Sequence, residues 1–212
     1  MLIDPFGRKI DYLRLSVTSR CNLRCVYCLP ASGFKPSPDV LTDDEIARLV
    51  SIFADLGVNK IRITGGEPLV RPAIVTLVNR LSKISQITPP LTSGGAIDFS
   101  MSTNGMLLER LALPLKKAGL NRINISLDSL RPERFKQITR QGRVEQVFQG
   151  INAALAAGLH PVKINVVVMR NINDDEIGNF VKLTYEMPLH VRFIELMPVG
   201  ETGFFSRKRH LP

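Results

Sequence analysis

Six short segments of the chain alternate apolar and polar residues, and longer segments with helical periodicity lie between them. The alternation predicts β-strands over residues 12–17, 60–64, 97–103, 122–127, 162–169 and 190–195. Residues 144–158 have the periodicity of an amphipathic helix, and prolines and glycines predict a loop-rich insertion over 89–95. Strands joined by helices pair in parallel, because each crossover returns the chain to the same edge of the sheet. The pattern therefore predicts an α/β fold.

Two helix starts have a recognisable sequence signal. Thr42 and Glu45 have the spacing of a capping box, and Gly57 marks the end of the helix that follows. Asn173 and Glu176 have the same spacing. We therefore expect a second helix to open at Asn173.

The predicted strands separate apolar from polar residues, because successive side chains point to opposite faces of a sheet. Arg14, Arg62, Ser126 and Lys163 all fall on the polar side. Strands covered by helices on both faces are apolar throughout, so helices are expected on one face only. Either the sheet curls around a wet cavity that suits an anion, or it is open with one solvated face. Alternation does not distinguish these two arrangements.

Composition restricts the classes of partner. The net charge of +9 suits nucleic acid, an anionic membrane or a polyanionic small molecule. The cations at 207–209 are interpreted as a solvated tail, and the others lack the basic stripe interleaved with aromatics that single-strand binding favours, so no nucleic-acid partner is expected. No segment approaches the roughly 20 apolar residues of a membrane helix, and residues 1–11 lack a signal-peptide core. We therefore expect no membrane association and a cytoplasmic protein.

Cys21, Cys25 and Cys28 lie within eight residues, after the first predicted strand. The carboxyl ends of parallel strands are where ligand sites gather in such folds. An odd, clustered count argues against disulfides. Three thiolates with this spacing can bind three irons of a cubane cluster and leave the fourth without a protein ligand. Structural zinc is the alternative, but zinc almost always takes four protein ligands, and no histidine has zinc-finger spacing.

This triad, with Tyr27 before its last cysteine, resembles the signature of radical S-adenosylmethionine (SAM) enzymes. The residues 65–68, Gly-Gly-Glu-Pro, resemble the element of that family that holds the SAM amino group through backbone and carboxylate. Within the superfamily, the resemblance is to the GTP 3',8-cyclase family, at residues 12–21, 60–69, 102–105, 124–129, 163–165 and 194–198. It implies an incomplete (βα)6 TIM-like barrel of the radical SAM type, with a core domain over 1–199 and a basic tail over 200–212.

The resemblance also implies an activity and its cofactors. The enzyme would be a radical SAM lyase that converts GTP to (8S)-3',8-cyclo-7,8-dihydroguanosine 5'-triphosphate in molybdenum cofactor biosynthesis. One 4Fe-4S cluster on the three cysteines and a 5'-deoxyadenosyl radical would carry the chemistry, with no catalytic side chain. The implied SAM contacts are Tyr27, Gly66, Ser126 and Met197, and the implied GTP contacts are Arg14, Arg62, Thr103 and Lys163. Thr103 has the parity of apolar residues, so its role requires the strand to end or bulge before it.

The implied partners are an electron donor and, as the next enzyme, cyclic pyranopterin monophosphate synthase, and a homodimer is compatible with the sequence. The family also carries a second cysteine triad for a second cluster and a terminal Gly-Gly, but no cysteine follows Cys28 here. We therefore expect a fragment or a truncated product, in which GTP binding and turnover are open questions. The alternatives are a radical SAM enzyme acting on a peptide or a deazapurine, and an inactive truncated scaffold.

Overall fold

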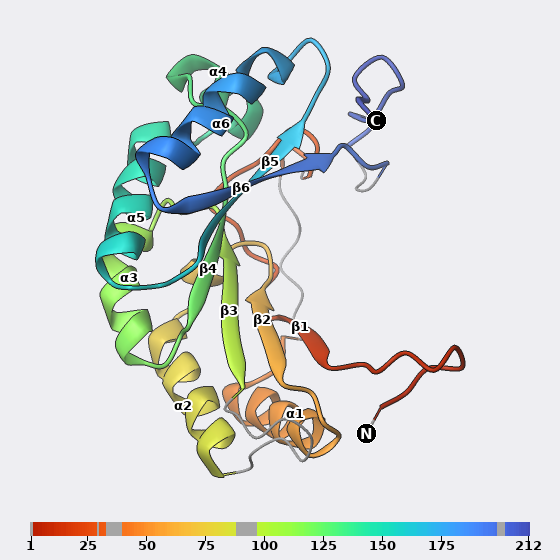
Figure 1. The fold of residues 1–212 in the computed structure, drawn as a ribbon, viewed down its shortest axis with the longest axis vertical. Helices are drawn as coiled ribbons and strands as arrows, with labels where there is room; N and C mark the ends of the chain where they lie inside the picture. The colour runs from red at the N-terminus through yellow and green to blue at the C-terminus, as the bar shows by residue number, and fades with distance from the viewer. Residues whose placement is uncertain (1, 29, 33–39, 88–96, 199–201) are drawn as a thin grey trace.

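A single parallel sheet forms the centre of the molecule (Figure 1). The computed structural model describes residues 2–28, 30–32, 40–87, 97–198 and 202–212. The strands are β1 (Tyr12–Ser16), β2 (Lys60–Thr64), β3 (Asp98–Thr103), β4 (Arg122–Ser126), β5 (Val162–Val168) and β6 (Leu189–Glu195). They pair in chain order, and every pair is parallel. The six predicted strands are confirmed, with bounds that differ by no more than one residue.

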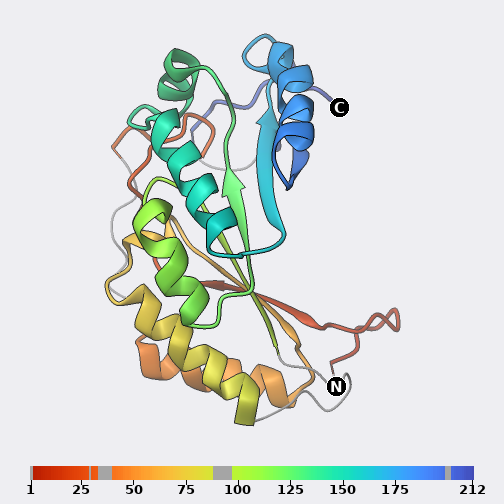
Figure 2. The ribbon, with the colours of Figure 1, turned by 60° about the vertical axis from the view of Figure 1, so that its left-hand side comes forward.

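The helices lie along one face of this sheet (Figure 2). They are α1 (Asp43–Asp55), α2 (Ile74–Ile87), α3 (Leu108–Lys117), α4 (Pro132–Thr139), α5 (Val144–Ala156) and α6 (Ile177–Glu186), with 3-10 turns η1 (Pro68–Val70) and η2 (Asp174–Glu176). The predicted insertion at 89–95 lies outside the described residues. No helix in the described part of the chain is both long and apolar enough to span a bilayer.

One of the two predicted capping boxes is present. Thr42 Oγ1 accepts from the backbone N–H of Glu45 at 3.2 Å, and the Glu45 carboxylate accepts from the backbone N–H of Thr42 at 2.8 Å. The capping box predicted at Asn173 is not present, because Oδ1 of Asn173 accepts from the backbone N–H of Met169 at 2.7 Å instead. Its amide nitrogen donates to the backbone carbonyls of Asp128 and Val167. The Asn173 side chain joins two strand ends, and α6 begins only after η2.

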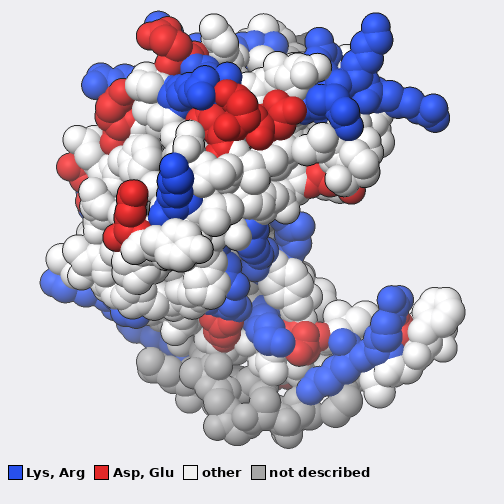
Figure 3. Space-filling model, turned by 45° about the horizontal axis from the view of Figure 1, so that its top comes forward, with Lys and Arg blue, Asp and Glu red and all other residues white. Residues whose placement is uncertain are grey.

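The apolar strand residues pack under the helices and form the core. Ile61, Ile63, Ile125 and Ile164 have no exposed surface. Apart from the buried Asn124, their polar neighbours on the strands are half-buried or exposed, so helices do not cover the second face of the sheet. On this side Figure 3 shows a hollow with basic side chains inside it. The sheet and its helices thus form the partial TIM-like barrel that the sequence predicts.

The C-terminal segment 202–212 folds back against the loop after β5. Arg170 donates from its backbone N–H to the carbonyl of Arg209 at 2.9 Å and from Nε to the carbonyl of His210 at 3.1 Å. The Arg209 guanidinium lies 4.5 Å from the centre of the Phe204 ring. The interpretation of 207–209 as a solvated tail therefore fits the first two residues, which are exposed, and is wrong for Arg209.

Candidate functional site

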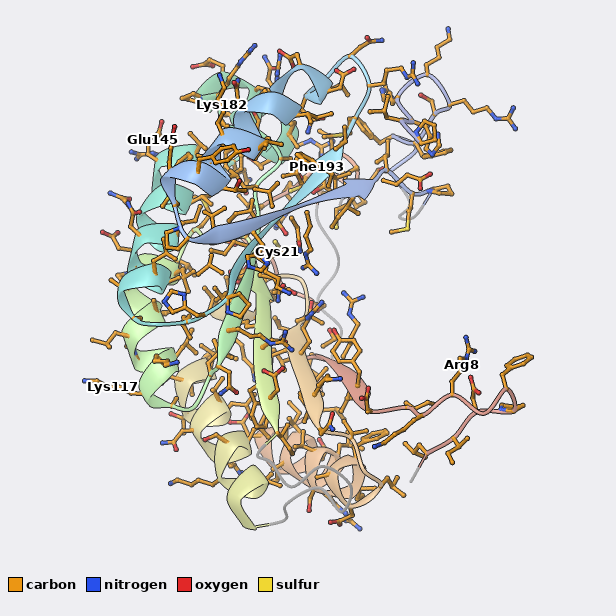
Figure 4. All side chains as sticks on the ribbon, viewed as in Figure 1. Arg8, Cys21, Lys117, Glu145, Lys182 and Phe193 are labelled. Atoms are coloured by element: carbon orange, nitrogen blue, oxygen red, sulfur yellow. The ribbon has the colours of Figure 1, made fainter. Side chains whose placement is uncertain are left out.

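A pocket of about 310 Å³ lies at the carboxyl ends of the strands. Its lining includes the three cysteines together with Gly66 and Ser126, which come from separate parts of the chain. Eight of the eleven predicted site residues line it, namely Arg14, Cys21, Cys25, Tyr27, Cys28, Gly66, Thr103 and Ser126. Figure 4 shows Cys21 on the inner side of the sheet. The parallel topology therefore gathers most of the predicted site in one place.

The cysteine loop, residues 21–28, is held by the last turn of α4. The backbone N–H of Arg24 donates to the carbonyl of Thr139 at 3.1 Å, and that of Val26 donates to the carbonyl of Ile138 at 2.9 Å. The carbonyls at a helix C-terminus have no partners within the helix, so they are free to accept such bonds. The loop backbone is thus fixed by the protein itself.

Burial raises the pKa of all three cysteine thiols. The carboxylate of Asp128 raises the pKa of Cys25 and Cys28 further. The thiols therefore keep their protons at neutral pH unless a cation binds and displaces them.

The donor set fits an iron-sulfur cluster better than zinc. The pocket offers three thiols from one loop, and zinc almost always needs a fourth protein ligand. A cubane cluster needs only three cysteines if one iron binds another molecule.

The Gly65-Gly66 turn lies directly against the chain that leads into the cysteine loop. The backbone N–H of Gly66 donates to the carbonyl of Thr18 at 2.7 Å, and that of Glu67 donates to the carbonyl of Arg20 at 2.8 Å. A Cβ on Gly65 would lie 2.4 Å from the Thr18 oxygen, and one on Gly66 would lie 2.4 Å from the Arg20 oxygen. Gly65 also has a φ of 153°. Only glycine allows this close approach.

The Glu67 side chain is buried and forms three hydrogen bonds within the protein. Oε1 accepts from the Leu69 backbone at 3.0 Å and from the Thr103 hydroxyl at 2.7 Å, and Oε2 accepts from the Asn104 backbone at 2.6 Å. Burial raises the pKa of Glu67, and these three donors oppose the rise. The carboxylate therefore joins the turn after β2 to the end of β3.

Thr103 is the hydroxyl partner of Glu67. Strand β3 runs in register through Thr103, which lies opposite Ile125, without a bulge. The side chain is buried, and its oxygen also accepts from the backbone N–H of Gly105 at 3.0 Å. A GTP contact at Thr103 requires the strand to end or bulge before this residue. The structure does not meet this condition.

Cations from five different strands lie along the open face of the sheet, at Arg14, Arg62, Arg122, Lys163 and Arg192. Lys60 has the same parity as Arg62 and pairs with Asp11 at the edge of this face. Burial lowers the pKa of the Lys163 ammonium group. The positive charges of Arg192, Arg122 and Arg62 lower it further. The cations thus act on one another, and a polyanion bound among them would relieve the repulsion.

Arg192 is a residue of this face that the sequence analysis did not single out. It lies opposite Asn165 in the register of β5 and β6, on the same side of the sheet as Lys163. Its guanidinium donates to the side-chain oxygens of Asn124 at 2.8 Å and Asn165 at 2.7 Å. The strand parity that identified Lys163 would also have identified Arg192.

The comparisons with known proteins agree with this geometry. The sequence model of the Radical SAM superfamily matches residues 15–184. The chain belongs to the radical SAM superfamily. Members of this superfamily use a 4Fe-4S cluster and SAM as cofactors.

The chain is similar to curated GTP 3',8-cyclases. That of Petrotoga mobilis is 53% identical over 207 residues, which are 97% of this chain and 61% of that protein. That of Heliobacterium modesticaldum is 55% identical over 202 residues, which are 94% of this chain and 59% of that protein. The radical SAM chain described here thus spans about three fifths of the length of these relatives.

Solved radical SAM structures share the fold. Streptococcus suis SuiB bound to S-adenosylmethionine superposes with a TM-score of 0.74 at 18% identity, over 93% of this chain and 43% of that chain. Methylornithine synthase superposes with a TM-score of 0.67 at 14% identity, over 88% of this chain and 53% of that chain. At these identities the likeness shows the fold alone.

Three of the predicted contact residues of the radical SAM site do not line the thiol pocket. Arg62 and Lys163 lie on the open sheet face, in β2 and β5. Met197 follows β6, and its surface is 52% exposed. The roles of these residues as ligand contacts stay predictions.

Proposed function

We propose that this chain is the cluster-binding and SAM-binding part of a GTP 3',8-cyclase. The enzyme converts GTP to (8S)-3',8-cyclo-7,8-dihydroguanosine 5'-triphosphate for molybdenum cofactor biosynthesis. One observation carries the proposal: three thiols share a pocket with the Gly-Gly-Glu turn, and Arg14 extends this pocket to the basic face of the sheet. The identity to named cyclases, above 50% over nearly the whole chain, supports the choice of substrate.

In this proposal Cys21, Cys25 and Cys28 hold one 4Fe-4S cluster. Tyr27, Gly66, Ser126 and Met197 contact SAM. When bound and reduced by one electron, the cluster would supply, with SAM, a 5'-deoxyadenosyl radical that can abstract hydrogen. No side chain acts as acid or base. The chain orients both ligands and keeps water away from the reacting atoms.

The cations of the open face bind the triphosphate. Arg14, Arg62 and Lys163 come from separate strands but share one face, and arginine can contact phosphate oxygens in pairs. Arg192 adds a fourth charge, already oriented by two asparagine oxygens. Thr103 lines the pocket, but its hydroxyl donates to Glu67, so it is not counted among the triphosphate contacts of this proposal.

The partners and boundaries belong to the same proposal. An electron donor reduces the cluster, and cyclic pyranopterin monophosphate synthase takes up the product. The protein acts in the cytoplasm, and a homodimer is compatible with its sequence. Its core domain spans 1–199, followed by the basic segment 200–212.

Anaerobic reconstitution tests this function directly. The purified chain is loaded with iron and sulfide, its iron and sulfide are counted, and SAM cleavage is measured after chemical reduction with and without GTP. We expect a brown protein with one 4Fe-4S cluster whose SAM cleavage depends on the three cysteines. A colourless or zinc-loaded protein would overturn the cluster assignment. A rate of SAM cleavage that is the same with and without GTP would instead favour another radical SAM substrate.

A further inference from the structure

Asn104 connects the Gly-Gly-Glu turn to the cysteine loop. It follows β3, lies in the pocket wall and is partly buried. Its backbone N–H donates to Oε2 of Glu67 at 2.6 Å, and its Oδ1 accepts from the backbone N–H of Met106 at 3.1 Å. These two bonds fix the position of the Asn104 backbone and the orientation of its side chain.

The remaining polar group of Asn104, the amide nitrogen Nδ2, points to the cysteine loop. It donates to Oδ1 of Asn22 at 2.8 Å and lies 4.0 Å from Sγ of Cys21. The second distance is at the outer limit of an N–H···S hydrogen bond. The same sulfur also accepts from the backbone N–H of Leu23 at 3.4 Å. Cys21 therefore faces two N–H donors.

We propose that Asn104 is a positioning residue for the cluster, which fixes the Cys21 side chain and directs an N–H donor at its sulfur. This inference rests on the proposed function, because it needs a cluster on the three cysteines. Donors to cluster sulfurs stabilise the negative charge that reduction adds, so they raise the reduction potential. Asn104 is neutral and does this without changing the charge of the site. Its backbone is held by Glu67, a buried carboxylate that also accepts from the Leu69 backbone and the Thr103 hydroxyl.

The test is a pair of variants that keep the turn and remove the donor. In Asn104→Ser the hydroxyl can still accept from the Met106 backbone but is too short to reach Cys21. In Asn104→Asp the Oδ1 acceptor also remains, while a negative charge replaces the donor. The matched control is Asn152→Ser, because Asn152 is exposed on α5. Each protein is reconstituted anaerobically, and the reduction potential of its cluster is measured by a titration followed with electron paramagnetic resonance.

We expect the potential to become more negative in Asn104→Ser and still more negative in Asn104→Asp, with the control unchanged. Loss of iron from a variant that still unfolds at the temperature of the parent also supports the inference, because it reports a misplaced Cys21. Potential, spectrum and iron content all equal to the parent in both variants would overturn it. If the parent itself assembles no cluster, the proposed function fails instead.

Discussion

Lys163 lies on the open face among three arginines, Arg62, Arg122 and Arg192. Burial and three neighbouring arginines lower the pKa of Lys163, so its charged form is destabilised and a bound anion would stabilise it. We expect Lys163→Ala to weaken GTP binding while SAM binding changes little. A charge-assisted contact contributes roughly 1.5–3 kcal/mol, so the loss should be about tenfold or more in Kd. Equilibrium binding of both ligands to the reconstituted protein checks this.

The control for this substitution is Lys182→Ala. Lys182 is exposed on α6, on the outer side of the molecule (Figure 4). It removes the same charge without touching the open face. Equal losses of GTP and SAM affinity in Lys163→Ala would mean that the side chain has a structural role.

At the scale of elements, the turn after β2 is tightly packed against the chain that leads into the cysteine loop. We expect Gly66→Ala to lower the free energy of unfolding by about 1–3 kcal/mol, because the new methyl group would meet the backbone oxygen of Arg20. It should also lower the iron content after reconstitution, since the displaced chain leads into the cysteine loop. Urea unfolding and iron counting measure the two effects.

Gly178→Ala is the matched control. A Cβ at Gly178 meets no atom within 4 Å, and the residue lies inside α6. Alanine favours a helix over glycine by about 1 kcal/mol, so this variant should be as stable as the parent or more so. A Gly66→Ala protein that matched Gly178→Ala in stability and iron content would refute the close-packing argument.

The elements of the fold could be predicted because their signals are local. Alternation of apolar and polar residues within one strand fixed each strand and assigned Arg62 and Lys163 to the open face. The capping box at Thr42 was predictable for the same reason, since its partner is three residues away.

What failed depends on residues far apart in the chain. The carboxylate of Glu176 accepts from the hydroxyl of Ser129, 47 residues earlier, and so does not complete the capping box that its spacing from Asn173 suggests. The hydroxyl of Thr103 binds Glu67, 36 residues earlier. No local pattern contains such a pair. Arg192 could have been predicted from strand parity, which places it on the same face as Lys163, although no family motif includes it.

At the scale of the whole molecule, one buried carboxyl makes folding depend on pH. Burial raises the pKa of Asp128 to about 6, against the opposing hydrogen bonds from Tyr27 and the Val167 backbone. In an unfolded chain an aspartate titrates near 4. Since the folded-state pKa is the higher one, the protonated form of Asp128 favours the folded protein. This contribution to stability is complete below pH 4 and is lost as the pH rises to about 6.

We expect the free energy of unfolding of the cluster-free protein to fall by roughly 3 kcal/mol between pH 4 and pH 6 because Asp128 ionises over this range. Asp128→Asn cannot titrate, so its stability should fall less than that of the parent between pH 4 and pH 6. Urea unfolding at a series of pH values gives both curves. Parallel curves would show that Asp128 ionises with little penalty in the folded protein.

The two backbone bonds from the cysteine loop to the end of α4 affect what happens to this part of the chain when a bound cluster is exposed to air. Iron-sulfur centres exposed to oxygen fall apart, and a ligand loop shaped only by its metal would then collapse. Here Arg24 and Val26 donate to the carbonyls of Thr139 and Ile138, and neither bond involves a cysteine side chain. We therefore expect that a damaged cluster can be lost and replaced while the backbone of the cysteine loop keeps its conformation.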